Sequence, residues 1–184
     1  MNVIIFHGTT GNPEENWFPW LKRELEKKGI EVVVPKFPTP EGQSLKAWLA
    51  VFEEYENKVN EETVMVGHSM GPGMILRLLE KRDKPIKQAI LAAPFYKMIG
   101  NEYFDNLNKT FIEHPFDWGK IKGKAKQFVV LAGDNDPYVP VEQPKFIAEK
   151  LGADFKLIKN GGHLNASAGF LKFEEVLREI VLLI

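Results

Sequence analysis

The sequence predicts a three-layer α/β domain built on a parallel sheet, and two observations support this fold class. Short apolar runs rich in β-branched residues recur along the chain, and they are continuous enough to be buried on both faces, as the strands of a parallel sheet are. Segments with the apolar spacing of an amphipathic helix separate these runs. Strands that alternate with helices are typical of sheets joined by right-handed crossovers.

Six runs have the length of a strand. They cover residues 3–6, 31–34, 63–66, 88–92, 127–131 and 155–158. Apolar side chains share one helical face in five intervening segments, which cover residues 17–25, 45–55, 75–79, 146–151 and 170–181. We expect the first of these helices to stop at Gly29 and the fourth at Gly152, since helices often end at a glycine. The VLLI end of the last segment is interpreted as core packing.

One connection, at about residues 94–125, is longer than the others. It is rich in rings, with Phe95, Tyr96, Tyr103, Phe104, Phe111, Phe116 and Trp118. Connections of this length usually have a function or contain helices of their own. Two interpretations remain open: a structural side core, or a cap-like excursion in which Phe95, Phe111 and Trp118 line a substrate pocket. Since no linker or repeat interrupts the chain, residues 1–184 are predicted to form a single domain.

Composition excludes several classes of function. The chain of 184 residues has a net charge of −1 and no separate block of basic residues, which argues against a nucleic-acid partner. It has no cysteine, so disulfides, thiolate-bound zinc and a cysteine nucleophile are excluded. Apolar stretches fall short of the ~20 residues that span a bilayer, and the first residues do not resemble a secretory leader. We therefore expect a cytoplasmic protein without a membrane partner.

The stretch GHSMG, residues 67–71, follows a predicted strand and precedes a predicted helix. Such a turn can present Ser69 as a nucleophile, because its backbone is held in a strained conformation that only small flanking residues permit. Gly67 and Gly71 meet that demand. A following helix directs its N-terminal N–H groups toward the place where an oxyanion would form. The motif alone is weak and also fits a purely structural turn, but its position favours a nucleophile elbow.

A catalytic histidine can be sought by chain order, since this kind of fold places the acid and then the histidine after the serine. Of the four histidines, His7 and His68 precede Ser69. His114 precedes the last cluster of acidic residues, which leaves His163 in the stretch KNGGHLN. Glycines there let a loop bring the imidazole back over the sheet. The alternative is a histidine that only caps the next helix.

The acidic partner is expected in LAGDNDPYVP, where Asp134 and Asp136 compete. The spacing Gly-x-x-Asp-x-x-Val-Pro favours Asp136, which would hold the tautomer of His163. Asp134 would then accept hydrogen bonds within the turn. A calcium-binding loop is excluded, because Val139 stands where that loop needs glycine and Lys145 where it needs glutamate.

Two backbone N–H groups are needed to hold an oxyanion, one after the nucleophile and one after the first strand. These requirements point to Met70 and, in FHGTTGN, to Thr9. The same loop is a poor phosphate cradle, because it lacks the glycine-rich signatures and Pro13 removes an N–H group. His7 is interpreted as a buried hydrogen-bonding residue and not as a metal ligand. No histidine pair in the chain has the helical spacing of a zinc site.

Four segments together resemble a known family. HGTTGNPEENWFPWL, GHSMG, GDNDPYVP and GGHLN, in this order on a short chain, are similar to the small α/β-hydrolases of the retinoblastoma-binding-protein-9 and YdeN type. The resemblance covers essentially the whole chain and implies an α/β-hydrolase fold without the first two strands of larger relatives. It further implies the strand order 2-1-3-4-5-6 and a triad of Ser69, Asp136 and His163. Pro72 departs from many relatives, at a position early enough in the helix to be tolerated.

These observations lead to a hypothesis and an alternative. The hypothesis is a serine hydrolase that cleaves a small ester, thioester or amide through an acyl-enzyme, without cofactor or metal, as a monomer or small homo-oligomer. The alternative is a binding protein that keeps the hydrolase fold with a dormant triad. Protein binding through the cysteine-containing motif for which the family is named is excluded, because this chain has no cysteine.

Overall fold

A computed structural model describes all 184 residues and contains one six-stranded sheet. The strands are β1 Asn2–Phe6, β2 Glu31–Val33, β3 Thr63–His68, β4 Ile86–Ala92, β5 Ala125–Gly133 and β6 Asp154–Ile158. Every neighbouring pair is parallel, in the order β2-β1-β3-β4-β5-β6. The six predicted strands and the order implied by the family resemblance are thus confirmed.

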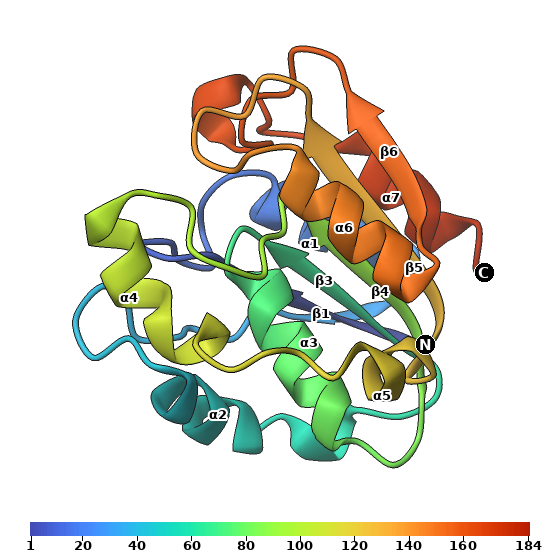
Figure 1. Cartoon of the computed structure of the whole chain (residues 1–184). Helices are drawn as coiled ribbons and strands as arrows, with labels where there is room; N and C mark the ends of the chain where they lie inside the picture. The colour runs from blue at the N-terminus through green and yellow to red at the C-terminus, as the bar shows by residue number, and fades with distance from the viewer.

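Helices cover both faces of the sheet (Figure 1). They are α1 Phe18–Glu26, α2 Leu45–Glu53, α3 Gly71–Lys81, α4 Glu102–Ile112, α5 Trp118–Lys122, α6 Glu142–Leu151 and α7 Glu174–Val181. Buried hydrophobic side chains of α1 and α7 belong to a cluster of 19 residues, and those of α2 to α6 to a cluster of 27. The sheet lies between these two clusters, which makes three layers.

The alternation of side chains along β1 shows why continuous apolar runs are needed. Ile4 and Phe6 belong to the larger cluster, whereas Val3 and Ile5 belong to the smaller one, and all four are fully buried. Successive residues of a strand point to opposite faces, so a strand covered on both sides favours apolar side chains at successive positions.

Two segments refine the expected boundaries. The predicted last helix, from residue 170, begins only at Glu174. Phe170 instead donates its N–H to the carbonyl of Asn165, and its ring packs against Phe173, so these residues form a turn before the helix. The long connection at 94–125 contains α4 and α5. In Figure 1, α4 lies on the side of the molecule where β3 has its carboxyl end.

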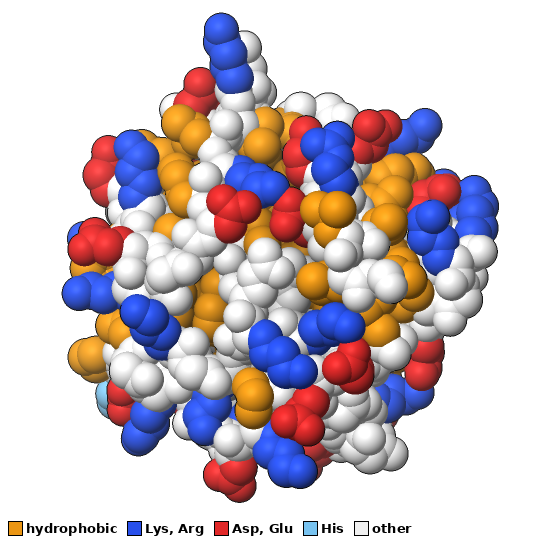
Figure 2. All heavy atoms as spheres, turned by 90° about the vertical axis from the view of Figure 1, so that its right-hand side faces the viewer, with side chains coloured by type: hydrophobic (Ala, Val, Ile, Leu, Met, Phe, Trp, Pro, Cys, Tyr) orange, Lys and Arg blue, Asp and Glu red, His pale blue; other side chains and the backbone are white.

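The surface carries charges of both signs. Basic and acidic side chains are interspersed with apolar ones over the face shown in Figure 2. This mixture agrees with a net charge of −1 spread over 24 basic and 25 acidic residues. None of the helices combines the length and the apolar character that a membrane crossing requires.

Candidate active site

The turn between β3 and α3 holds Ser69 with a φ of +59°, in the left-handed region that is costly for most residues. A Cβ atom on Gly67 would lie 2.6 Å from the nitrogen of Pro72, and one on Gly71 would lie 2.3 Å from the carbonyl oxygen of Phe6. Both positions therefore accept only glycine. The N–H of Ser69 donates to the carbonyl of Ala92 at 2.9 Å, which ties the turn to β4.

A second loop, after β1, approaches the same serine. A Cβ atom on Gly8 would lie 2.7 Å from the Cβ of Ser69, so a side chain there would collide with the serine. The backbone N–H groups of Thr9, in this loop, and of Met70, at the N-terminus of α3, donate to no acceptor within the protein. The structure thus leaves free the two donors that the sequence predicts for an oxyanion hole.

Ser69, His163 and Asp136 form a hydrogen-bonded chain. The Nε2 atom of His163 lies 3.0 Å from the Oγ of Ser69, and its Nδ1 lies 2.7 Å from Oδ2 of Asp136. The other oxygen of Asp136 accepts the N–H groups of Tyr138 and Val139, at 2.9 and 3.1 Å. A carboxylate with three donors is fixed in orientation, and it requires that Nδ1 of the imidazole carries the proton.

Asp134, the competing acid in the sequence, has a different environment. Its Oδ1 accepts the N–H of Asn160 at 2.7 Å, which links the end of β5 to the loop after β6. It makes no hydrogen bond to His163, so the structure brings Asp136 and not Asp134 into the chain.

Comparison with known proteins settles the family. Residues 3–181 match the family model described as serine hydrolase. The chain belongs to the serine hydrolase family. The resemblance found in the sequence is thereby confirmed, and it extends to the fold.

Among relatives of this serine hydrolase, the protein YdeN of Bacillus subtilis strain 168 is 32% identical over 170 residues, which is 91% of this chain and 88% of YdeN. The crystal structure of the ydeN gene product superposes with a TM-score of 0.91 at 30% identity, covering 98% of this chain and 96% of that one. The serine hydrolase RBBP9 of Rattus norvegicus is 24% identical over 181 residues, 97% of this chain and 92% of its own.

More distant structures resemble the serine hydrolase in fold alone. Est1E of Butyrivibrio proteoclasticus, in a structure with bound ferulic acid, gives a TM-score of 0.74 at 16% identity, over 99% of this chain and 88% of that one. Together with the strand order, these likenesses identify the fold as that of the α/β-hydrolases.

The loop that carries His163 is held by two residues that directly precede α1, Asn16 and Trp17. The indole Nε1 of Trp17 donates to the carbonyl of Leu164 at 3.0 Å, and the side-chain oxygen of Asn16 accepts the N–H of Ala166 at 2.8 Å. Asn16 and Trp17 begin the NWFPWL stretch that supported the family resemblance. Their role in holding this loop was not foreseen in the sequence, although the specificity of that stretch was a signal.

His68 and His7 form a neutral layer beneath the site. Burial lowers the pKa of His68 to about 3, so its imidazole is neutral. Its Nε2 lies 2.8 Å from the carbonyl of His163, which can only accept, so Nε2 carries the proton and donates it. Burial likewise lowers the pKa of His7, whose Nε2 accepts the N–H of Phe37 at 3.0 Å. The other nitrogen of His7 then donates to the carbonyl of Gly8 at 2.9 Å. His7 is therefore a buried hydrogen-bonding residue, and His68 supports the His163 backbone.

A cavity of about 140 Å³ opens beside Ser69. Its walls are Thr9, Thr10, Ser69, Phe95, Ile99, Phe104, Asn108, Tyr138, Val139, His163 and Asn165. Besides Phe95, the 94–125 segment contributes Ile99, Phe104 and Asn108, so part of this segment faces the site. Phe104, Asn108 and Tyr138 were not predicted from the sequence as pocket residues.

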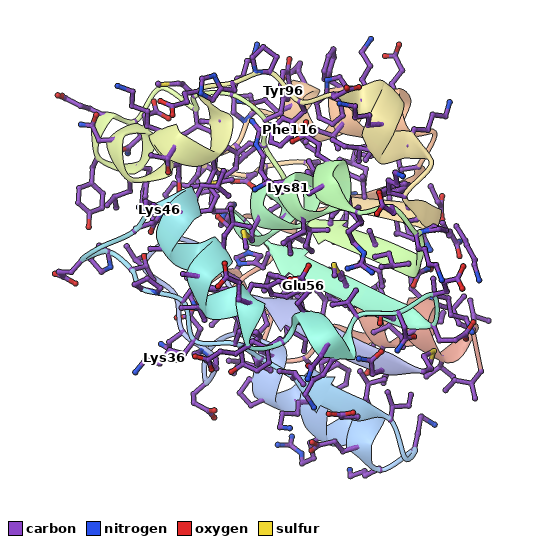
Figure 3. The ribbon with its side chains drawn as sticks, turned by 90° about the horizontal axis from the view of Figure 1, so that it is seen from below. Lys36, Lys46, Glu56, Lys81, Tyr96 and Phe116 are labelled. Atoms are coloured by element: carbon purple, nitrogen blue, oxygen red, sulfur yellow. The ribbon has the colours of Figure 1, made fainter.

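Two of the three predicted pocket residues lie elsewhere. Phe111 is fully buried, and its ring packs edge-on against Trp48 of α2 at 4.9 Å. Trp118 packs against Tyr96 and Phe116, at 6.0 and 5.2 Å between ring centres, and these two residues are labelled in Figure 3. Only Phe95 reaches the cavity, because Phe111 belongs to the larger core cluster and Trp118 packs against that cluster.

A larger hollow of about 520 Å³ lies between α2 and the end of α3, away from Ser69. Glu56 and Lys81, labelled in Figure 3, are among its walls, which contain no serine, threonine or histidine. No three histidine, aspartate or glutamate side chains anywhere in the structure are arranged to hold a metal ion.

Proposed function

We propose that this serine hydrolase cleaves a small ester, thioester or amide through an acyl-enzyme formed on Ser69. The observation that supports this most strongly is the unbroken chain from Ser69 Oγ through His163 to Asp136, at 3.0 and 2.7 Å. A nucleophile, a base within hydrogen-bonding distance and a group that orients the base are the three parts that acyl transfer needs.

In the first half-reaction, Ser69 Oγ attacks the carbonyl carbon while its proton passes to Nε2 of His163. Charge develops on the carbonyl oxygen, where the free N–H groups of Thr9 and Met70 would donate to it. The tetrahedral intermediate then collapses, and His163 returns the proton to the leaving group. In the second half-reaction a water molecule attacks the acyl-enzyme with His163 as base, and the acid and free Ser69 are released.

Asp136 has an electrostatic and orienting role in this scheme. It accepts the proton-bearing Nδ1 of His163, so the imidazole keeps Nε2 free for the serine, and its negative charge stabilises the imidazolium that forms. Because its second oxygen is held by two backbone N–H groups, the carboxylate cannot rotate away.

The size of the cavity points to small substrates. A volume of about 140 Å³ lies below the 300 Å³ or more that is typical of pockets for drug-sized ligands. Each buried methylene contributes about 0.8 kcal/mol until the space is full. We therefore propose acyl groups in the range of acetyl to butyryl.

Labelling with a fluorophosphonate probe tests this proposal, because only an activated serine reacts with it. We expect one covalent label on the folded protein, mapped to Ser69 by peptide mass spectrometry. The label should be absent from Ser69→Ala and retained in Ser167→Ala, which changes an exposed serine. A folded wild-type protein that stays unlabelled would identify a binding protein with a dormant triad.

A further inference from the structure

Asn108 is a buried polar residue in the wall of the active-site cavity. It lies on α4, it is only 2% exposed, and its side-chain oxygen accepts the hydroxyl of Thr9 and the side-chain NH₂ of Gln43, the latter at 2.9 Å. A buried amide costs free energy unless all of its polar atoms find partners.

The orientation of this amide follows from its neighbours. The nitrogen of Gln43 lies 3.1 Å from the carbonyl oxygen of Leu107, which can only accept a hydrogen bond. The Gln43 nitrogen is thus a donor, and the Asn108 atom 2.9 Å from it has to be the oxygen. The NH₂ group of Asn108 therefore points away from Gln43.

This NH₂ group has no acceptor in the protein. No side-chain hydrogen bond involves it. Two side-chain polar atoms are both fully inaccessible and without a partner, Nε of Arg82 and Oε1 of Gln88, and the Asn108 nitrogen is not one of them. It therefore reaches open space, and the open space beside Asn108 is the cavity next to Ser69. The NH₂ group of Asn108 thus adds two unused hydrogen-bond donors to the cavity wall, beside the free N–H of Thr9.

We assign Asn108 to the acyl side of the reacting centre. Its oxygen is bonded to Thr9, whose N–H we assign to the oxyanion hole, whereas the leaving group departs toward His163, against which the ring of Tyr138 packs at 5.1 Å. The walls contain no Asp, Glu, Lys or Arg, and His163 is already bonded to Ser69 and Asp136, so no further charged side chain would compensate a charge on the acyl group.

We propose that the NH₂ group of Asn108 binds an oxygen of the acyl group, and that the substrates are short, uncharged acyl compounds that carry an ether, hydroxyl or keto oxygen close to the reacting carbonyl. This inference rests on the proposed function. A donor left unpaired by a purely aliphatic acyl group is a penalty, and an acceptor on the acyl group removes it.

Two p-nitrophenyl esters test the proposal. Methoxyacetate and butyrate have acyl chains of equal length, and an ether oxygen in the first replaces a methylene in the second. For the wild type, we take the kcat/KM for methoxyacetate over that for butyrate and divide it by the same ratio of their rates with hydroxide. We expect this corrected ratio to exceed one. In Asn108→Asp and Asn108→Leu this ratio should fall roughly 10-fold, since both remove the donor while only the first keeps the bonds to Thr9 and Gln43.

Thr9→Val is the matched control, because it breaks the Thr9–Asn108 bond without removing the NH₂ group; it should slow both esters alike and leave their ratio within about 2-fold. Titration with a fluorophosphonate gives the active fraction of each variant. If wild type hydrolyses both esters but neither Asn108 variant changes the ratio, the assignment of Asn108 is refuted while the proposed function stands. Wild-type protein inert to both esters and to the probe would refute both.

Discussion

The turn that carries Ser69 and the segment 94–125 both form walls of the same cavity, but different interactions fix them in place. The turn is fixed by close backbone approaches, in which Gly67 and Gly71 leave no room for a Cβ atom. The segment is fixed by side chains. Asp105 accepts the N–H groups of Ile99 and Gly100, and Gln143 of α6 accepts those of Tyr96 and Lys97.

This difference separates reaction from recognition. Backbone geometry that only glycine allows tolerates no substitution, so the reacting groups should respond to small changes with large losses. Contacts made by side chains can be exchanged more freely, so changes in α4 should shift the choice of substrate while the chemistry persists. The predictions below test this contrast, beginning with the largest expected effect.

Replacing each of the two competing acids by asparagine should affect kcat/KM very differently. Asp136→Asn should lower kcat/KM for an activated ester by on the order of 10³-fold, because an amide can donate to Nδ1 and favours the wrong tautomer of His163. Asp134→Asn, which keeps an oxygen for the N–H of Asn160, should cost less than about 10-fold. Circular dichroism checks that both variants fold. If Asp134→Asn is the inactive one, our assignment of the acid is wrong.

Gly8→Ala tests the backbone contact behind the nucleophile. Its new methyl group would lie 2.7 Å from the Cβ of Ser69, so we expect a loss of about 10²-fold in kcat/KM as the serine is displaced. Gly123→Ala is the control, since no atom lies within 4 Å of its added Cβ and its φ is −88°. Equal activity of the two variants would mean that the turn tolerates movement and that the contrast with α4 is unfounded.

Two phenylalanines of α4 should divide stability from specificity. Phe111→Ala should reduce the free energy of unfolding by about 3–5 kcal/mol without changing the preference for acyl length, because that ring lies in the core. Phe104→Ala should enlarge the cavity and improve hydrolysis of longer acyl esters by roughly 4-fold per methylene relative to butyrate. Urea unfolding and a series of p-nitrophenyl esters measure the two effects. A shifted length preference in Phe111→Ala would place that ring at the substrate.

The neutral histidines should make the fold sensitive to mild acid. Their pKa values are lowered in the folded state from 6.5, so below pH 6.5 the unfolded chain binds protons that the folded one does not, and stability falls as the pH falls. For His68, whose pKa is lowered to about 3 in the folded state, the slope approaches about 1.4 kcal/mol per pH unit. His68→Gln should lower this slope between pH 6.5 and 4.5, whereas His114→Gln, at an exposed site, should keep it. An unchanged slope in His68→Gln would argue that His68 is not held neutral.

The contrast also explains what the sequence could predict. The Ser69 turn and Gly152, whose φ of +66° ends α6, are local demands on backbone shape, and local demands leave a mark on the sequence. The central strands β1, β3 and β4 were recognisable because nearly all of their residues are buried. Chain order then selected His163, since only one histidine followed the candidate acids.

The pocket could not be predicted in the same way. Phe104, Asn108 and Phe111 follow one another at spacings of four and three, so they share the inward face of α4. Periodicity identifies that face, but it cannot say which turn lies over the cavity and which over Trp48. The polar Asn108 between two rings was the signal that part of this face lies over a cavity and not over the core.

The account depends most on Ser69 and His163 acting as one unit, and a double-mutant cycle tests this directly. Ser69→Ala and His163→Ala should each lower kcat/KM for an activated ester by on the order of 10³-fold or more. The double variant should be about as slow as either single variant, because a base without its nucleophile has nothing to activate. If the two losses multiply instead, the side chains work independently, and the hydrogen bond of 3.0 Å between them is not the basis of catalysis.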